Sequence, residues 1–358
     1  MDALIQLLYS IPLAGLVFQF GGYLVAALPN VAPGILQAAT PIALAALCGV
    51  MCERSGVVNI GIEGIMIMAA FVGWYAGVLA VPVLGSASIG PFGITPALIV
   101  ALGAALLSGV VISALHAWLS ITVRADQIIS GTILNIVAFG LTGYLNNLIS
   151  QTSPNGAGQF IQFRPPQALV EIPVIGWILN MFLSQGPITM SVIVLVIVFQ
   201  VLLFRSRWGL RSRAVGEHPR AAETVGINVI RVRYRNVLIG GLFAALGGAY
   251  LSLEATNSFQ QGMTTGRGFI GLAAMIVGRW SPLGAFGAAL LFSSSTALGN
   301  SIKFSPPGGD LGNILSGLPD QVYDALPYLV TIIILAGFIG RSIPPAADGQ
   351  PYEREAAT

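Results

Sequence analysis

Charged residues are scarce in this chain of 358 residues, where Asp, Glu, Lys and Arg together make up only 8% of the sequence. A soluble globular protein has about a quarter of its residues in this class. Hydrophobic residues account for 55%, and the mean hydropathy is +0.83, so water is not the main solvent of the chain. The net charge of +2 is too small to indicate a nucleic-acid partner. We predict an all-α polytopic membrane protein, embedded in lipid, in which residues 1–358 form a single transmembrane domain.

Lysine, histidine and cysteine are also rare. Lys303 is the single lysine, so no phosphate-binding loop of the GxxxxGK[ST] type exists and this route to ATP binding is excluded. His116 and His218 are the only histidines, which excludes an HExxH metal site, and no GxSxG motif occurs, so an enzyme is the least supported class. We interpret His116 as a packed helix residue. Cys48 and Cys52 lie on one predicted helix, so they form neither a disulfide framework nor a metal site.

Long apolar runs repeat along nearly the whole chain, and a membrane-spanning helix needs about 20 such residues. The predicted spans, about ten in number, are 4–28, 34–52, 57–80, 94–121, 127–150, 187–204, 236–254, 266–279, 283–300 and 325–340. In this count the third and eighth spans hold matching places in two halves of five, and an odd number per half makes the halves inverted.

Arginine is distributed unevenly between the predicted loops. Half of the 16 basic residues lie in the loop at about 205–235, and short basic loops stay in the cytoplasm. Counting spans from this loop places both termini, including the tail 341–358, on the same side. Only Arg164, Lys303 and Arg267 fall on the opposite side.

Two long loops are predicted on the outside, at about 151–186 and 301–324. Each is long enough to receive a partner, although a plain connection is an equal interpretation. No basic stretch precedes the first apolar run, which favours a retained span over a cleaved signal peptide.

A polar, glycine-rich stretch opens the third span and contains Asn59, Gly61, Glu63 and Gly64. A charge at this depth is costly unless it is paired or faces water. The glycines allow a helix to start late, with its amide groups aimed at a cavity, which would make this stretch part of a pathway. The alternative is a tight cytoplasmic turn in which Glu63 pairs with Arg54.

The eighth span opens in a similar way, with Arg267, Gly268 and Phe269. Short or glycine-interrupted segments at matching positions indicate the central pathway of a transporter. We therefore include these residues among the pathway candidates.

A further polar cluster opens the fifth span. Asp126 is expected to cap that helix, and Gln127, Thr132 and Asn135 share roughly one of its faces. This face either lines a pathway or bonds to neighbouring helices. Glu254, at the end of the seventh span, is expected to be solvated.

The arginine-rich loop contains a short helix with clear boundaries. Pro219 is placed for a helix start and Gly226 for a stop after about two turns. Ala221 and Ala222 are small and would allow another surface to approach closely. The alternative is an ordinary loop that its arginines keep in the cytoplasm. This alternative explains the charges of the loop but not the short helix.

These motifs resemble those of permease subunits in bacterial nucleoside and simple-sugar ABC importers, a group that includes ribose and branched-chain amino acid permeases. The match begins with CERSGVVNIGIEG at 52–64 and ADQIISGT at 125–132. It continues at 214–228, 266–284 and 344–352. The form of the first motif is more similar to nucleoside permeases than to sugar or amino acid permeases.

The resemblance implies an importer of the bacterial inner membrane with a pair of permease subunits, identical or different, a pair of ATPase subunits and an outside substrate-binding protein or lipoprotein. ATP and magnesium would be bound by the ATPase, and this chain would carry no cofactor. In this family the cytoplasmic loop after the sixth span docks the ATPase. The corresponding coupling residues here are Glu217, His218, Pro219, Arg220, Ala221, Ala222, Gly226 and Ile227.

Two other functions compete with this interpretation. An ion-coupled secondary transporter of a small polar solute would need titratable groups deep in the spans, whereas most acidic residues fall at predicted span ends. A membrane scaffold would not need polar glycine breaks in two matching spans.

Overall fold

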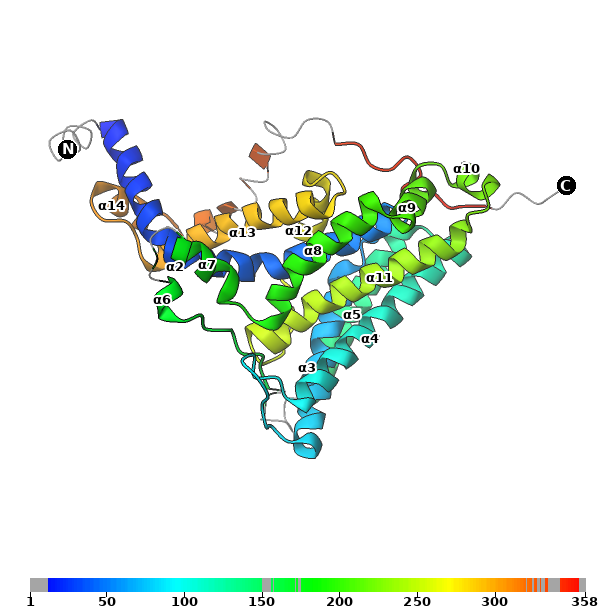
Figure 1. The fold of residues 1–358 in the computed structure, drawn as a ribbon, viewed down its shortest axis with the longest axis horizontal. Helices are drawn as coiled ribbons and strands as arrows, with labels where there is room; N and C mark the ends of the chain where they lie inside the picture. Colours follow the sequence, from blue (N-terminus) through cyan, green and yellow to red (C-terminus); the bar gives the residue numbers. More distant parts are fainter. Residues whose placement is uncertain are drawn as a thin grey trace. The chain divides into compact units, whose positions relative to one another are not determined.

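Helices dominate the computed structural model of the chain (Figure 1). The structure describes residues 12–149, 156, 158–170, 172, 175–319, 321–323, 325–326, 329, 332–333 and 342–353. Within these residues it contains no β-strand beyond an isolated bridge between Ile89 and Ile94. The prediction of an all-α protein is confirmed for this part of the chain.

The chain divides into two compact units. The first comprises Met1–Ala39, Arg164–Gln185 and Leu290–Gly340. The second comprises Thr40–Phe163, Gly186–Ala289 and Arg341–Thr358.

The helices before the arginine-rich loop are α2 (Pro12–Glu53), α3 (Ile62–Leu84), α4 (Pro96–Ala117), α5 (Gln127–Ile149), α6 (Gln167–Val170), α7 (Ile175–Leu183) and α8 (Pro187–Arg205). Those that follow are α9 (Arg207–Glu217), α10 (Pro219–Thr224), α11 (Val229–Ala249), α12 (Arg267–Val277), α13 (Pro282–Phe304) and α14 (Asp310–Ser316). Two π-helical turns, η1 (Trp118–Val123) and η2 (Tyr250–Ala255), extend α4 and α11.

Seven of the described helices are long and apolar enough to cross a membrane. They are Val31–Glu53, Ile62–Leu84, Pro96–Val123, Gln127–Ile149, Pro187–Arg205, Val229–Ala255 and Pro282–Phe304. Each matches a predicted span. The chain is therefore a multi-pass membrane protein, but the count of about ten and the two inverted halves stay predictions.

The remaining predicted spans have different outcomes. The segment 266–279 forms only the short apolar helix α12, of 11 residues, and 325–340 lies largely outside the described residues. The segment 4–28 is not separated from 34–52, because α2 runs unbroken over 42 residues. Within α2, Val31–Glu53 is the candidate span and Gly15–Pro29 is a shorter apolar stretch. Pro29 and Pro33 each remove a helix hydrogen bond, which favours a bend, and α2 changes direction along its course in Figure 1.

The first unit joins the start of α2 to the end of α13. Tyr23 Oη lies 2.8 Å from Ser301 Oγ, and Gln19 Oε1 accepts the backbone N–H of Leu311 at 3.3 Å. The predicted loop at 301–324 is partly helical, because α14 lies within it.

The core of the second unit consists of α3, α4, α5 and α11, which run side by side in Figure 1. Backbone contact between α11 and α3 depends on Gly248, because a Cβ there would lie 2.1 Å from the carbonyl oxygen of Met66. This glycine therefore permits close packing of α11 against α3.

We expect Gly248→Ala to lower the stability of the protein by about 1–3 kcal/mol, since the obstructing atom is backbone and cannot rotate away. Gly103→Ala is the matched control: this glycine also lies in a helix, but a Cβ there would have nothing within 4 Å, so the alanine should be neutral or slightly stabilising. The measurement is the thermal unfolding midpoint in detergent. Equal midpoints for the two variants would contradict the contact.

Candidate functional site

The two segments predicted to form a pathway meet at Glu63, which is 1% exposed. Its carboxylate accepts the backbone N–H of Gly266 at 2.8 Å and of Gly268 at 2.6 Å. These amides start α12, where N–H groups have no partner within the helix and a negative charge is favourable. A Cβ on Gly268 would lie 2.6 Å from Glu63 Oε2, so the approach requires glycine. Glu63 therefore caps a helix that begins far along the chain.

The alternative pairing of Glu63 with Arg54 is wrong. The Arg54 guanidinium instead donates to the carbonyl oxygens of Trp280 at 2.8 Å and Arg279 at 3.1 Å. Burial lowers the pKa of Arg54, and the nearby Glu217 carboxylate opposes this shift. Arg54 thus attaches residues 54–61, the connection between α2 and α3, to the end of α12.

One face of α5 bonds to the same region. Gln127 Oε1 accepts the backbone N–H of Val58 at 2.7 Å. Asn135 accepts the N–H of Gly64 at 2.7 Å and donates to the carbonyl of Ile60 at 3.0 Å. The side chains of Gln127 and Asn135 therefore hydrogen-bond to a neighbouring segment of the chain.

Asn59 and Gly61 are buried between helices. Asn59 is 0% exposed and its Nδ2 lies 3.9 Å from Cys48 Sγ. Gly61 faces Gly131 of α5, since a Cβ on Gly61 would lie 3.4 Å from Gly131 Cα. Both residues belong to the packed interior of the second unit.

The other pathway candidates are more accessible. Thr132 is exposed and donates to the carbonyl of Ile128 in its own helix at 2.8 Å. Phe269 is 46% exposed. Arg267 is half-buried and donates to the carbonyl of Met263 at 2.8 Å. The hydrogen bonds of Thr132 and Arg267 thus go to backbone carbonyls and not to the Glu63 carboxylate.

Glu254 is a second buried carboxylate, which the sequence did not reveal. It was expected to be solvated, but it is 4% exposed and accepts the N–H of Ile188 at 2.7 Å and of Thr189 at 3.2 Å. The hydroxyl of Thr189 adds a third hydrogen bond at 2.6 Å. The expectation is wrong because Glu254 lies in the π-helical turn η2, beside the unpaired amides at the start of α8. The sequence feature that could have indicated this contact was the helix start at Gly186-Pro187.

Asp126 caps a helix and His116 is packed in the interior, as predicted from the sequence. Asp126 caps α5 by accepting the N–H of Ile128 and of Ile129, both at 2.9 Å. His116 is 0% exposed, with ring nitrogens 3.0 Å from Val58 O and from Ser130 Oγ. Across the described residues, no group of three or more His, Cys, Asp or Glu side chains is placed to hold a metal ion.

The short helix predicted in the arginine-rich loop is α10. It starts at Pro219 and ends at Thr224, and Gly226 follows with a φ of +81°. Ala221 is exposed, whereas Ala222 is 4% exposed. Of the alanine pair, only Ala221 lies on the outer surface of α10.

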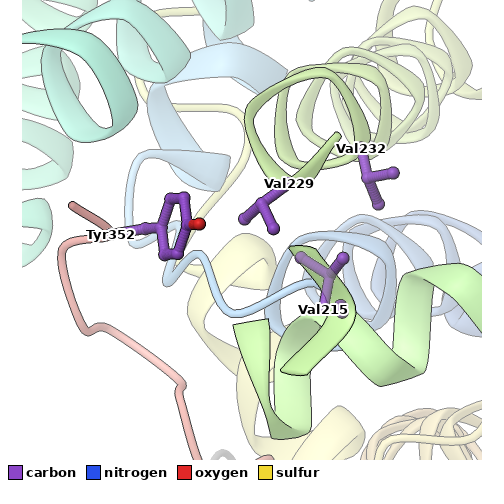
Figure 2. Packing of buried hydrophobic residues seen from close by; sticks show 5 residues of the cluster. Val215, Val229, Val232 and Tyr352 are labelled. Atoms are coloured by element: carbon purple, nitrogen blue, oxygen red, sulfur yellow. The ribbon is translucent and has the colours of Figure 1, made fainter. Parts of the chain in front are cut away.

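Ala222 instead belongs to a small apolar cluster beneath α10. Figure 2 shows the arrangement of Val215 from α9, Val229 and Val232 from α11, and Tyr352 from the C-terminal end of the chain. The cluster holds α10 against the start of α11.

Residues 342–353, which we call the C-terminal segment, run along α9 and α10 (Figure 1). The sequence indicates their importance only through the family resemblance at 344–352. Within this segment, burial raises the pKa of Asp348 to about 6, and the Arg233 guanidinium opposes the rise. Close by, Glu53 at the end of α2 accepts the indole N–H of Trp280 at 2.5 Å.

A cavity of about 720 Å³ lies between α10 and the C-terminal segment. The described residues that line it are Glu217, His218, Pro219, Arg220, Ala221, Arg233, Ala346, Ala347, Gln350, Pro351, Tyr352 and Glu353. Five predicted coupling residues, from Glu217 to Ala221, therefore face a common hollow.

We expect Glu254→Ala to destabilise the start of α8 by about 1–3 kcal/mol, because it leaves buried N–H groups without an acceptor. Glu254→Gln retains one carbonyl oxygen and should have a smaller effect. Amide hydrogen exchange at Ile188 and Thr189 is the measurement. Unchanged protection in the alanine variant would show that these amides do not depend on Glu254.

The comparisons with known proteins agree with this architecture. The family model described as "Branched-chain amino acid transport system / permease component" matches residues 32–335. The guanosine ABC transporter permease protein NupQ of Bacillus subtilis (strain 168) is 40% identical over 326 residues, which cover 90% of this chain and 96% of NupQ. The nucleoside ABC transporter permease protein NupC of Lactococcus lactis subsp. cremoris (strain MG1363) is 38% identical over 316 residues, covering 87% and 93% of the two chains.

A third relative, the putative glucose ABC transporter permease protein TsgC13 of Haloferax volcanii, is 33% identical over 334 residues, covering 89% of this chain and 96% of the relative. No solved structure matches the chain. The resemblance to ABC importer permeases seen in the sequence motifs is confirmed. The family match and these long alignments mean that the chain belongs to the family of branched-chain amino acid transport system permease components.

Proposed function

We propose that the chain is the membrane-spanning subunit of an ATP-driven importer, in which it forms the pathway for a nucleoside and docks a separate ATPase. The observation that carries the proposal is α10, a short helix with Ala221 on its exposed surface. A helix of this kind, outside the spans and held in place by a buried cluster, offers a rigid surface to a partner.

The substrate class rests on the relatives. NupQ is named for guanosine and NupC for nucleosides, at 40% and 38% identity. TsgC13, named for glucose, is less similar, at 33%. A nucleoside contains both a sugar and a base, so a related simple sugar is the next substrate class to examine.

The complete importer would contain this permease with a second permease subunit, identical or different, and an ATPase that binds ATP and magnesium. A substrate-binding protein or lipoprotein would deliver the solute from outside. The arginines between α8 and α11 support a cytoplasmic location for that side of the protein and for both termini. The membrane would be the bacterial inner membrane.

The pathway is proposed to pass near the start of α12. This helix has 11 residues and is therefore about 16 Å long, which is about half the hydrocarbon thickness of a bilayer. Helices that begin within the membrane are common at transporter pathways. The capping of α12 by Glu63 supports this location.

Ion-coupled secondary transport has less support. A coupling ion or proton needs a buried group that can accept it. The buried carboxylates Glu63 and Glu254 each accept at least two backbone N–H groups, so lone pairs that would receive a coupling ion are already used in hydrogen bonds.

We expect Ala221→Glu to weaken association of the ATPase subunit at least tenfold, or about 1.4 kcal/mol or more, because a large charged side chain would be buried unpaired in the docking surface. Nucleoside uptake and substrate-stimulated ATP hydrolysis should fall to background. The measurements are copurification of the ATPase from membranes and uptake by cells or vesicles.

Arg205→Gln is the matched control, because Arg205 is an exposed residue at the end of α8, outside α10. It should retain both activities. If Ala221→Glu retains both normal ATPase association and normal uptake, α10 is not the docking element.

We expect Glu63→Gln to reduce uptake at least about tenfold while the ATPase stays associated, because the amide nitrogen would face N–H donors and leave one of them unpaired. Asp126→Asn is an isosteric control at an exposed helix cap and should transport normally. Wild-type uptake by Glu63→Gln would remove this contact from the pathway.

A further inference from the structure

The C-terminal segment is bonded directly to the end of α9. The backbone N–H of Ala347 donates to the carbonyl of Gly216 at 2.9 Å, and the N–H of Ala346 donates to Glu217 Oε2 at 3.1 Å. A segment without regular secondary structure has no internal hydrogen-bond ladder, so its position depends on such bonds. Here they attach it just before α10.

Tyr352 anchors the same segment beneath α10. It is 8% exposed and lies within the apolar cluster (Figure 2). Its hydroxyl donates to the Glu223 carboxylate of α10. The Arg233 guanidinium of α11 lies 5.9 Å from the ring centroid and donates to the carbonyl of Gln350 at 2.9 Å. The segment therefore contacts the end of α9, Glu223 near the end of α10, and the start of α11.

The other side of the segment contacts the connection between α2 and α3. Gly56 has a φ of +81°, and a Cβ there would lie 2.9 Å from the carbonyl oxygen of Ala347. A Cβ on Gly349 would lie 3.3 Å from Val58. Residues 54–58 thus pack directly against the C-terminal segment.

This connection continues into the residues that hold α12. Val58 and Gly64 donate to Gln127 and Asn135 of α5, and Glu63 caps α12. Residues 54–64 therefore contact the C-terminal segment at one end and the start of α12 at the other. Coupling between separate sites travels through contiguous packed and hydrogen-bonded elements of this kind.

We propose that the C-terminal segment transmits movement between α10 and residues 54–64, with Tyr352 as the positioning residue that holds α10 on the segment. The proposal rests on the proposed function, since α10 must receive the ATPase. Movement of α10 then displaces Ala346 and Ala347, and through them Gly56 and the residues that hold α12. In this proposal Tyr352 acts by positioning α10 and the segment through these contacts.

The test compares variants of Tyr352 in the complete importer. We expect Tyr352→Ala to lower substrate stimulation of ATP hydrolysis and nucleoside uptake about tenfold, with ATPase association and basal hydrolysis measured in the same preparation. Tyr352→Phe keeps the ring and removes the hydroxyl that donates to Glu223, so it should restore most of the uptake. A residue with a merely structural role would instead change uptake, basal hydrolysis and permease abundance together.

A second, less disruptive variant tests the same proposal with a lower risk of misfolding. Glu217→Ala removes an exposed acceptor of Ala346 and should reduce substrate stimulation about threefold at normal permease abundance. Ile343→Ala is the control on the same segment, because Ile343 is 72% exposed and is not among the described residues that line the cavity. It should leave uptake and substrate stimulation unchanged.

The outcomes separate the two proposals. Normal uptake and stimulation in both Tyr352→Ala and Glu217→Ala, with the ATPase bound, would overturn the transmission role and leave the proposed function intact. Release of the ATPase by Tyr352→Ala would assign the segment to docking and would also overturn transmission. Failure of the unaltered permease to copurify with an ATPase would instead contradict the proposed function itself. Loss of substrate stimulation with retained association and basal hydrolysis is the result that supports transmission.

Discussion

The hydrogen bonds from the start of α12 to Glu63 impose the constraint on which the rest of the candidate site depends. A helix that begins inside a membrane protein has N–H groups with neither water nor backbone partners, and each unpaired group is costly. Glu63 satisfies two of them and brings a negative charge to the positive end of the helix dipole. The short helix α12 is held beside α3 in this way, and the α2–α3 connection must follow a path that keeps Glu63 in place.

The same solution recurs at the start of α8, where Glu254 takes the position that Glu63 takes at α12. In both cases one helix supplies a carboxylate to a helix that starts elsewhere in the second unit. Such a bond fixes the relative height of two helices along the bundle, which apolar packing alone leaves free to slide. Gly186 and Gly268 permit these close approaches, because a Cβ on Gly186 would lie 2.3 Å from Glu254 Cδ and a Cβ on Gly268 would lie 2.6 Å from Glu63 Oε2.

At the arginine-rich side, the candidate coupling surface is made of two parts. Helix α10 contributes Ala221, and the C-terminal segment contributes the opposite wall of the cavity and, through Tyr352, part of the cluster beneath the helix. Because that segment also packs against Gly56, the surface offered to a partner and the residues that hold α12 are connected through a few direct contacts.

The sequence by itself determined the membrane class, the positions of most spans and the boundaries of α10, because these depend on local properties. Apolar length decides a span, and Pro219 and Gly226 decide where a short helix starts and stops. Only the tertiary structure decided the partners of Glu63 and Glu254 and the course of the C-terminal segment. Their partners lie far away along the chain. The periodicity and spacing of the sequence do not indicate which helix start a buried carboxylate will contact. The physical reason is that a local pattern shows that a polar group needs a partner, whereas only the fold brings that partner within hydrogen-bonding distance.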